Sequence, residues 1–156
     1  MKKRSRYKPK GVILDTMGWV KQGMKRVEQL DSIGIDLKIK NHAALASLVQ
    51  GRGTRDDIDL VINALNMTEA LAIVNAELGS DWREEIRLAQ DALLAMIQRG
   101  VQLGDRFIFR GDEMKAVNLG MEIHDAQLER STVRDIELAL DRVNQEIKNK
   151  RARLIQ

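Results

Sequence analysis

His42 and His124 are the only histidines of the chain, and cysteine is absent. A transition-metal site would therefore have to combine one of these histidines with carboxylates. His124 stands beside Asp125 and two residues after Glu122, which together offer nitrogen and oxygen ligands. Adjacent residues do not share a helix face, however, and no His-x-x-x-His pair is present. His124 also falls on an apolar stripe, so we expect a core or interface histidine and no metal site. His42, directly after Asn41, is expected in a helix cap region.

Carboxylates gather in three short clusters, and each cluster falls where a helix is expected to begin. The clusters are Asp56, Asp57 and Asp59; Glu84 and Glu85; and Asp112 and Glu113. Capping and the helix dipole account for acids in a first turn, whereas a catalytic pair needs apolar surroundings that raise one pKa. The stretch GRGT lacks the strand and lysine of a phosphate-binding loop, and no Gly-x-Ser-x-Gly elbow occurs. We expect no catalytic residue, no cofactor and no enzyme activity.

Composition bounds the class of protein. The 156 residues suffice for one domain with a substantial core. Few aromatic residues and a single proline favour helices over a β-sandwich. The absence of cysteine excludes disulfides and fits a reducing compartment. No apolar run follows the charged first residues, and none approaches the roughly 20 residues of a membrane span, so we expect a cytoplasmic protein without membrane contact.

The net charge of +3 conceals two basic ends on an acidic body. Residues 1–10 carry six bases and no acid: Lys2, Lys3, Arg4, Arg6, Lys8 and Lys10. Residues 147–156 carry four bases and no acid, which leaves 16 bases against 23 acids in between. Basic ends can contact phosphates through counterion release, or they can be solvated termini. We expect a disordered basic tail over 1–11 and a single helical domain over 12–156.

Apolar periodicity predicts an all-α fold of about six helices in a bundle. The stripes run from Ile13 to Val27 and over 41–50, 54–78, 81–103, 112–128 and 132–147. The helix over 54–78 is apolar on two neighbouring faces, which indicates a central helix that ends at Gly79. The stretch LDSIGIDLKIKN before the second helix alternates and contains glycine, which predicts a loop or short extended piece, with Asn41 as the cap.

Capping signals mark the other helix boundaries. Gly51 predicts a left-handed stop for the second helix. Side chains that can bond the free backbone N–H groups of a first turn stand at the predicted starts of the later helices. The predicted cap residues are Thr54 with Asp57, Asp81 with Glu84, Asp112, and Thr132 with Asp135.

The short connection ERST predicts that the last two helices lie antiparallel as a long C-terminal hairpin over 112–150. The last helix carries a stripe with coiled-coil spacing and charged flanks, which a second subunit could share. Its members are Val133, Ile136, Leu140, Val143 and Ile147. We therefore expect a homo-oligomer, most simply a dimer, with this stripe split between core and interface.

The stretch HAALASLVQGRGTRDDIDLVINAL, residues 42–65, has the helix, glycine turn and second helix of a DNA-reading motif. With Gly51 in the turn, Ser47 is the small residue that the motif needs, but Asp57 takes the place of an apolar lock. The opening TRDDID carries three carboxylates that repel phosphate, which Arg52 and Arg55 compensate only in part. A bundle corner is the favoured interpretation, and nucleic-acid contacts by the two arginines are the alternative.

Aromatic residues alternate with arginines in RFIFR, residues 106–110, a pattern that suits stacking on unpaired bases. The alternative is a linker pinned to the core by its two phenylalanines. Trp19 and Trp82, near the starts of predicted helices, are most simply core anchors.

Two stretches, LKIKNHAALASLVQGRGTRDDIDLVINALNMTEAL and MEIHDAQLERSTVRDIELALDRVNQEIKNKRA, resemble a group of small uncharacterised proteins from proteobacterial genomes and their phages or mobile elements. Members are sometimes labelled Fis-family regulators. A Fis-type C-terminal helix-turn-helix needs a basic recognition helix near the end, whereas here ERST is followed by the acidic opening VRDIE. The resemblance spans about half the chain and implies a bacterial or phage accessory setting, with no functional residue carried over.

These patterns favour a non-enzymatic helical interaction or regulatory protein that acts by binding a macromolecular partner. The acidic body, the basic ends and the stripe of the last helix are the features that point to it. The alternative is a nucleic-acid-binding transcriptional regulator that uses the basic termini and the 42–65 corner.

Overall fold

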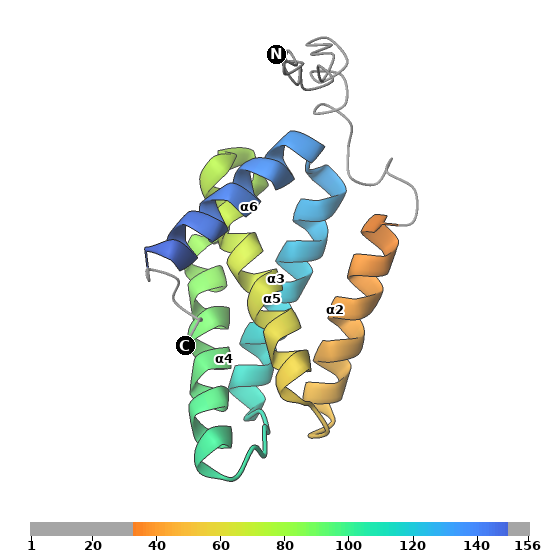
Figure 1. The fold of residues 1–156 in the computed structure, drawn as a ribbon, viewed down its shortest axis with the longest axis vertical. Coiled ribbons are helices and arrows are strands. Elements are labelled where there is room, and N and C mark those ends of the chain that lie inside the picture. The colour runs from red at the N-terminus through yellow and green to blue at the C-terminus, as the bar shows by residue number, and fades with distance from the viewer. Residues whose placement is uncertain (1–32, 150–156) are drawn as a thin grey trace, which may run out of the picture.

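The computed structural model describes residues 33–149, and every regular element in that range is helical (Figure 1). The elements are α2 (Ile33–Val49), α3 (Arg55–Val74), the 3-10 turns η2 (Ala76–Leu78) and η3 (Ser80–Trp82), α4 (Arg83–Gln102), α5 (Gly111–Arg130) and α6 (Val133–Lys148). The expected all-α fold is confirmed for this part of the chain. The helix expected from Ile13 to Val27 and the basic tail over 1–11 lie outside the described residues. No helix in the described range is long and apolar enough to cross a bilayer.

The central position of α3 is confirmed. It packs against α2, α4, α5 and α6, and Figure 1 shows it running through the middle of the bundle. Its two apolar faces explain the position, because neighbours on both sides are needed to remove them from water. Val61, Leu65 and Leu71 have no exposed surface. The helix that the sequence marks as apolar over most of its girth is therefore the scaffold for the other four.

The corner between α2 and α3 forms as its capping signals predict. Gly51 has a φ of +70°, the left-handed conformation that ends a helix at low cost for glycine. The Thr54 backbone N–H donates to the Asp57 carboxylate at 2.8 Å, and Thr54 Oγ1 accepts from the Asp57 N–H at 3.3 Å. The capping box is thus complete. The same reciprocal pair joins Thr132 and Asp135 at the start of α6.

The prediction of a loop or extended piece before the second helix is wrong. The α2 helix already begins at Ile33 and continues through the alternating residues of IGIDLKIKN to Val49. Ala44 and Leu48 bury one face of α2 in the main core. Asn41 is 3% exposed within this helix and does not cap it. Packing against α3 and α5 overrides the local glycine and the weak periodicity, as tertiary contacts often do.

Three other predicted helix boundaries also differ. The α3 helix ends at Val74 rather than Gly79, because the Asn75 side chain accepts from the Glu77 N–H at 3.1 Å and starts the first 3-10 turn. The α4 helix begins at Arg83 without a side-chain cap, so Asp81 does not open it. At α5, the Arg110 N–H donates to Glu113 Oε2 at 2.9 Å, and Asp112 is not the cap.

The expected long hairpin of the last two helices over 112–150 is not formed. The chain is extended at Ser131 and Thr132, and α6 then turns across α3 instead of running back along α5 (Figure 1). Ile136, Ala139 and Val143 of α6 pack against the second half of α3. The buried face of α5 is already occupied by α3 and α4, so the apolar stripe of α6 finds its partner on α3.

Candidate functional site

His124 is a core histidine, as its position on the apolar stripe predicts. It is 1% exposed, and its Nδ1 has no hydrogen-bond partner in the described part of the chain. Burial lowers its pKa from 6.5 to about 4, although the neighbouring Asp125 charge opposes the shift. The ring is therefore neutral at pH 7. No three His, Asp or Glu side chains within residues 33–149 are grouped so that they could hold a metal ion.

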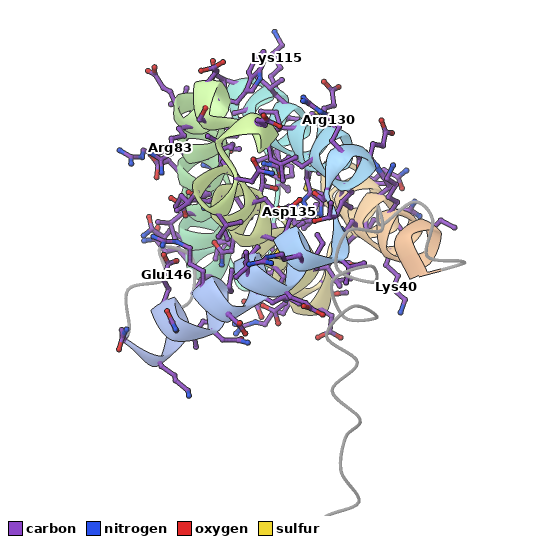
Figure 2. The ribbon with its side chains drawn as sticks, turned by 90° about the horizontal axis from the view of Figure 1, so that it is seen from above. Lys40, Arg83, Lys115, Arg130, Asp135 and Glu146 are labelled. Atoms are coloured by element: carbon purple, nitrogen blue, oxygen red, sulfur yellow. The ribbon has the colours of Figure 1, made fainter. Side chains whose placement is uncertain are left out.

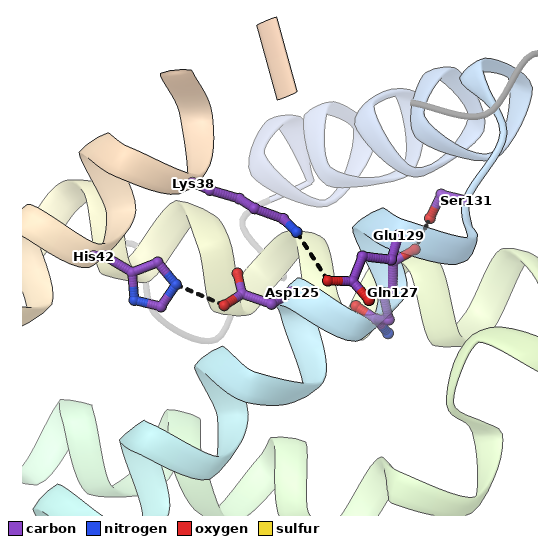
Figure 3. A network of polar contacts seen from close by, with 6 residues as sticks. All are labelled: Lys38, His42, Asp125, Gln127, Glu129 and Ser131. Atoms are coloured by element: carbon purple, nitrogen blue, oxygen red, sulfur yellow. Dashed lines mark hydrogen bonds and ion pairs between the residues drawn. The ribbon is translucent and has the colours of Figure 1, made fainter. Parts of the chain in front are cut away.

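Two polar pairs join α2 to α5 (Figure 3). His42 Nε2 lies 2.6 Å from Asp125 Oδ2, and Lys38 Nζ lies 3.2 Å from Glu129 Oε1. His42 is therefore an interhelical contact rather than a cap residue. Each helix contributes two residues spaced by four, which places both pairs on one line between antiparallel helices. That spacing was visible in the sequence, but the partner helix was not.

Arg55, a candidate nucleic-acid contact, is bound within the protein. Its Nε and Nη2 donate to the two carboxylate oxygens of Asp105 at 2.9 and 2.8 Å. This hydrogen bond lowers the pKa of Asp105 and raises the pKa of Arg55. Arg52 donates to the side chain of Gln50. The other candidate contacts, Lys2, Lys3, Arg4, Arg6, Lys8 and Lys10, lie outside the described residues.

The segment over 106–110 is a linker pinned to the core, as the alternative interpretation predicts. Phe107 and Phe109 are 3% and 8% exposed, so neither ring presents a face to a base. Arg99 fixes the segment by donating to the Ile108 carbonyl at 2.9 Å and to both Glu113 oxygens at 2.9 and 2.5 Å. The hydrogen bonds from Arg99 lower the pKa of Glu113.

A groove of 380 Å³ lies between the two 3-10 turns and the second half of α5, and we call it the Trp82 groove. Trp82, predicted to be a core anchor, is instead 49% exposed on its wall. Gly79, with a φ of +128°, redirects the chain between the two turns, and the Trp82 N–H donates to the Gly79 carbonyl at 3.0 Å. This tight turn at the bundle end keeps the indole out of the core.

A buried amide and four charged side chains also line the Trp82 groove. Gln127 is 3% exposed and donates through Nε2 to the carbonyls of Thr68 and Leu78 at 2.9 and 2.7 Å. Its Oε1 has no hydrogen-bond partner among the described residues. The charged side chains are Glu77, Asp81, Glu122 and Arg130. Sequence reasoning missed this site, because each acid has an ordinary helix-start or surface explanation until the fold brings them together.

The stripe of α6 is split between a covered and an uncovered part. Ile136 and Val143 are partly buried against α3, whereas Leu140 and Ile147 are 48% and 42% exposed. Leu138, on another side of the same helix, is 43% exposed. The outer edge of the stripe, Leu140 and Ile147, is thus an apolar strip on the molecular surface.

A scan against protein-family models, a search of curated proteins and a search of solved structures each gave no match for this chain. The surfaces of the chain itself are therefore the basis on which a function can be argued.

Proposed function

We propose that this chain is a non-enzymatic helical interaction or regulatory protein of a bacterial or phage setting, which forms a homodimer and acts by binding a macromolecular partner. The observation that carries the proposal is the half-covered stripe of α6. Its inner part is packed on α3, and its outer edge leaves Leu140 and Ile147 nearly half exposed. A second copy of the same edge would remove both side chains from water.

The geometry of α6 favours an antiparallel pair. Leu140 and Ile147 are seven residues apart and lie on the same side of the helix, since each residue advances the helix by about 100°. A two-fold axis between Val143 and Asn144 places Leu140 of one protomer against the partner subunit's Ile147. The contact is then self-complementary, as a two-fold interface requires.

Charge along α6 supports the same orientation. The first turns carry Arg134, Asp135 and Glu137, a net charge of −1, and the last turns carry Glu146 and Lys148, which cancel (Figure 2 labels Asp135 and Glu146 near the two ends). Lys150, Arg151 and Arg153 follow in the sequence. An antiparallel pair brings the acidic start of one helix to the basic end of the other, whereas a parallel pair would juxtapose like charges.

Light scattering of the full chain tests the dimer directly. We expect a mass of twice the chain's 17.7 kDa at high micromolar concentration. A mass of one chain under those conditions would contradict the proposal. The binding partner is then sought with the dimer as bait, washed at two salt concentrations with and without nuclease, because phosphate contacts are far more sensitive to salt than apolar ones.

Nucleic-acid binding by the basic termini and the 42–65 corner is the second candidate. It is favoured by the six bases without an acid over residues 1–10. It takes second place because Asp105 already binds Arg55, and Asp56, Asp57 and Asp59 surround the start of α3. This alternative requires duplex or single-strand binding at low salt, with a slope against salt that flattens when residues 1–10 are removed.

A further inference from the structure

The Trp82 groove combines features that suit one kind of guest, a cationic side chain. Glu77, Asp81 and Glu122 outnumber Arg130 among its charged lining residues, which gives the groove a net charge of −2. Trp82 offers a half-exposed indole face, the best aromatic partner for a guanidinium or ammonium group. A concave site of 380 Å³ is large enough for a long side chain and part of its backbone.

The side chain of Gln127 fixes one wall of the groove. Gln127 lines the groove, is 97% buried, and has both its amide hydrogens engaged by the carbonyls of Thr68 and Leu78. Its Oε1 is left without a partner among the described residues, and an unmade hydrogen bond at a buried oxygen is costly. The two bonds from Nε2 tie the first 3-10 turn to α3 and α5, and Oε1 has almost no accessible surface, so a guest meets the acids and the indole rather than this oxygen.

We propose that the basic N-terminal segment of the same chain, residues 1–10, binds in the Trp82 groove and places an arginine, Arg4 or Arg6, over the indole. The charges are complementary, because this segment has six bases and no acid while the groove is acidic. Arginine fits better than lysine, since its planar fork can stack on an aromatic ring and bind a carboxylate through two hydrogen bonds at once.

The chain is long enough to reach. Ile33 opens α2 at the end of the bundle where α3 stops and the two 3-10 turns lie (Figure 1). Residues 11–32 separate the basic segment from Ile33. With the helix that periodicity predicts over 13–27, this stretch of 22 residues can span about 45 Å. The 20-residue α5 helix, whose second half lines the groove, is only about 30 Å long. The contact therefore needs no rearrangement of the bundle.

The proposal goes beyond dimer formation and gives the basic segment a second role. The bases over 1–10 that could contact phosphate are the same bases that the groove would hold. An anionic partner would then have to compete with the groove for them, so the groove limits binding of the segment to phosphates.

Quenching of Trp82 fluorescence in the full chain tests this contact. The sequence has two tryptophans, so Trp19→Phe leaves Trp82 as the single reporter. Acrylamide quenching is compared between about 0.02 M and 0.5 M NaCl, over which the Debye length falls from roughly 20 Å to 4 Å. We expect the quenching constant to rise about twofold as salt screens the contact and uncovers the indole.

Two variants decide the outcome. Replacing the six bases of 1–10 by Gln should give the high quenching constant at every salt concentration. Replacing the groove acids (Glu77→Gln, Asp81→Asn, Glu122→Gln) should also give the high quenching constant at every salt concentration. As a control, replacing three acids outside the groove (Asp59→Asn, Glu137→Gln, Asp141→Asn) should leave the rise of the quenching constant with salt as it is in the parent. Circular dichroism confirms that each chain keeps its helices. Equal quenching constants for the parent and the six-Gln chain at low salt would overturn the proposal.

A last comparison separates this contact from the dimer. In a chain that also carries Leu140→Asp, the salt response should persist at concentrations where light scattering shows a monomer. Loss of the response in that chain would assign the contact to a second copy and overturn the intramolecular proposal. If the parent is monomeric and the response is present, the dimer fails and the groove proposal stands.

Discussion

His42 Nε2 and Asp125 Oδ2 lie 2.6 Å apart and join the middle of α2 to the last third of α5 (Figure 3). With the Lys38–Glu129 pair one turn away, this contact holds α2 along α5, with which it otherwise makes few contacts. The α2 helix depends otherwise on Ala44, Leu45 and Leu48, which insert into the main core. The two polar pairs therefore fix the rotation of α2 about its own axis, because the apolar face of this helix is narrow.

His42→Ala should destabilise the fold by roughly 0.5–1 kcal/mol, because the pair is half exposed on the histidine side and solvent screens it. Urea unfolding followed by circular dichroism measures the change. Asp125→Asn should cost a similar amount, and the double variant should cost less than the sum of the two. Lys40→Ala, on the exposed side of the same helix, is the matched control. Additive losses in the double variant would show that the pair contributes no coupling energy.

Acid should weaken the fold through His124. Its folded pKa is about 4, below the ordinary 6.5, because burial penalises the charged ring. Between these two pH values the unfolded chain takes up a proton that the folded chain refuses, so stability falls as the pH drops through this window and levels off below it. The loss approaches about 3 kcal/mol.

Urea midpoints of the parent and of His124→Gln, measured from pH 7 to pH 4, check this prediction. Carboxylates titrate in both chains, so the difference between the two curves isolates the histidine. The difference should grow steadily as the pH falls below 6.5. Parallel curves over that range would mean that His124 is more easily protonated in the folded chain than its burial implies.

Leu140→Asp should raise the dissociation constant of the dimer at least tenfold. A tenfold rise corresponds to a loss of about 1.4 kcal/mol of binding free energy, and burying a carboxylate in the interface costs more than that. Leu138→Asp is the matched control, because both leucines are nearly half exposed and lie about 200° apart around α6. Sedimentation equilibrium gives both dissociation constants. A dimer weakened equally by the two variants would place the interface on another side of α6.

Gly100→Ala should destabilise the fold by about 1–3 kcal/mol, the usual cost of overpacking. A Cβ at this position would overlap the Phe107 ring and come within 3.1 Å of the Arg106 carbonyl. Gly111→Ala is the control, since nothing lies within 4 Å of its Cβ and alanine favours the helix start. Thermal unfolding distinguishes them. A neutral Gly100→Ala would show that the Phe107 ring can move aside without loss of packing.

Local signals in the sequence predicted part of the local structure, although the caps expected at Asn41, Asp81 and Asp112 do not form. The Thr54–Asp57 and Thr132–Asp135 capping boxes and the left-handed Gly51 each depend on residues within three or four positions, and all three form. The central role of α3 was also predictable, because a helix with two apolar faces can be stable in water only when both are covered. His124 was recognisable as a core residue for the same reason, since it stands in register with apolar neighbours.

What the sequence did not predict depends on which helices meet. The start of α2 at Ile33 and the turn of α6 across α3 are set by contacts between distant segments. The same holds for the Trp82 groove, whose acids come from the 3-10 turns and from α5.

The sequence by itself thus determined the all-α character of the described residues, most of their helix stripes and the caps at Thr54 and Thr132, because hydrogen bonding and periodicity act within one or two turns. Only the tertiary structure decided the direction of α6, the Lys38–Glu129 and His42–Asp125 line, and the acidic groove beside Trp82. Burial of apolar area has no direction of its own. The choice of partner for each stripe is therefore made by the whole bundle, in which α3 and α4 already cover the buried face of α5, so α6 packs on the second half of α3.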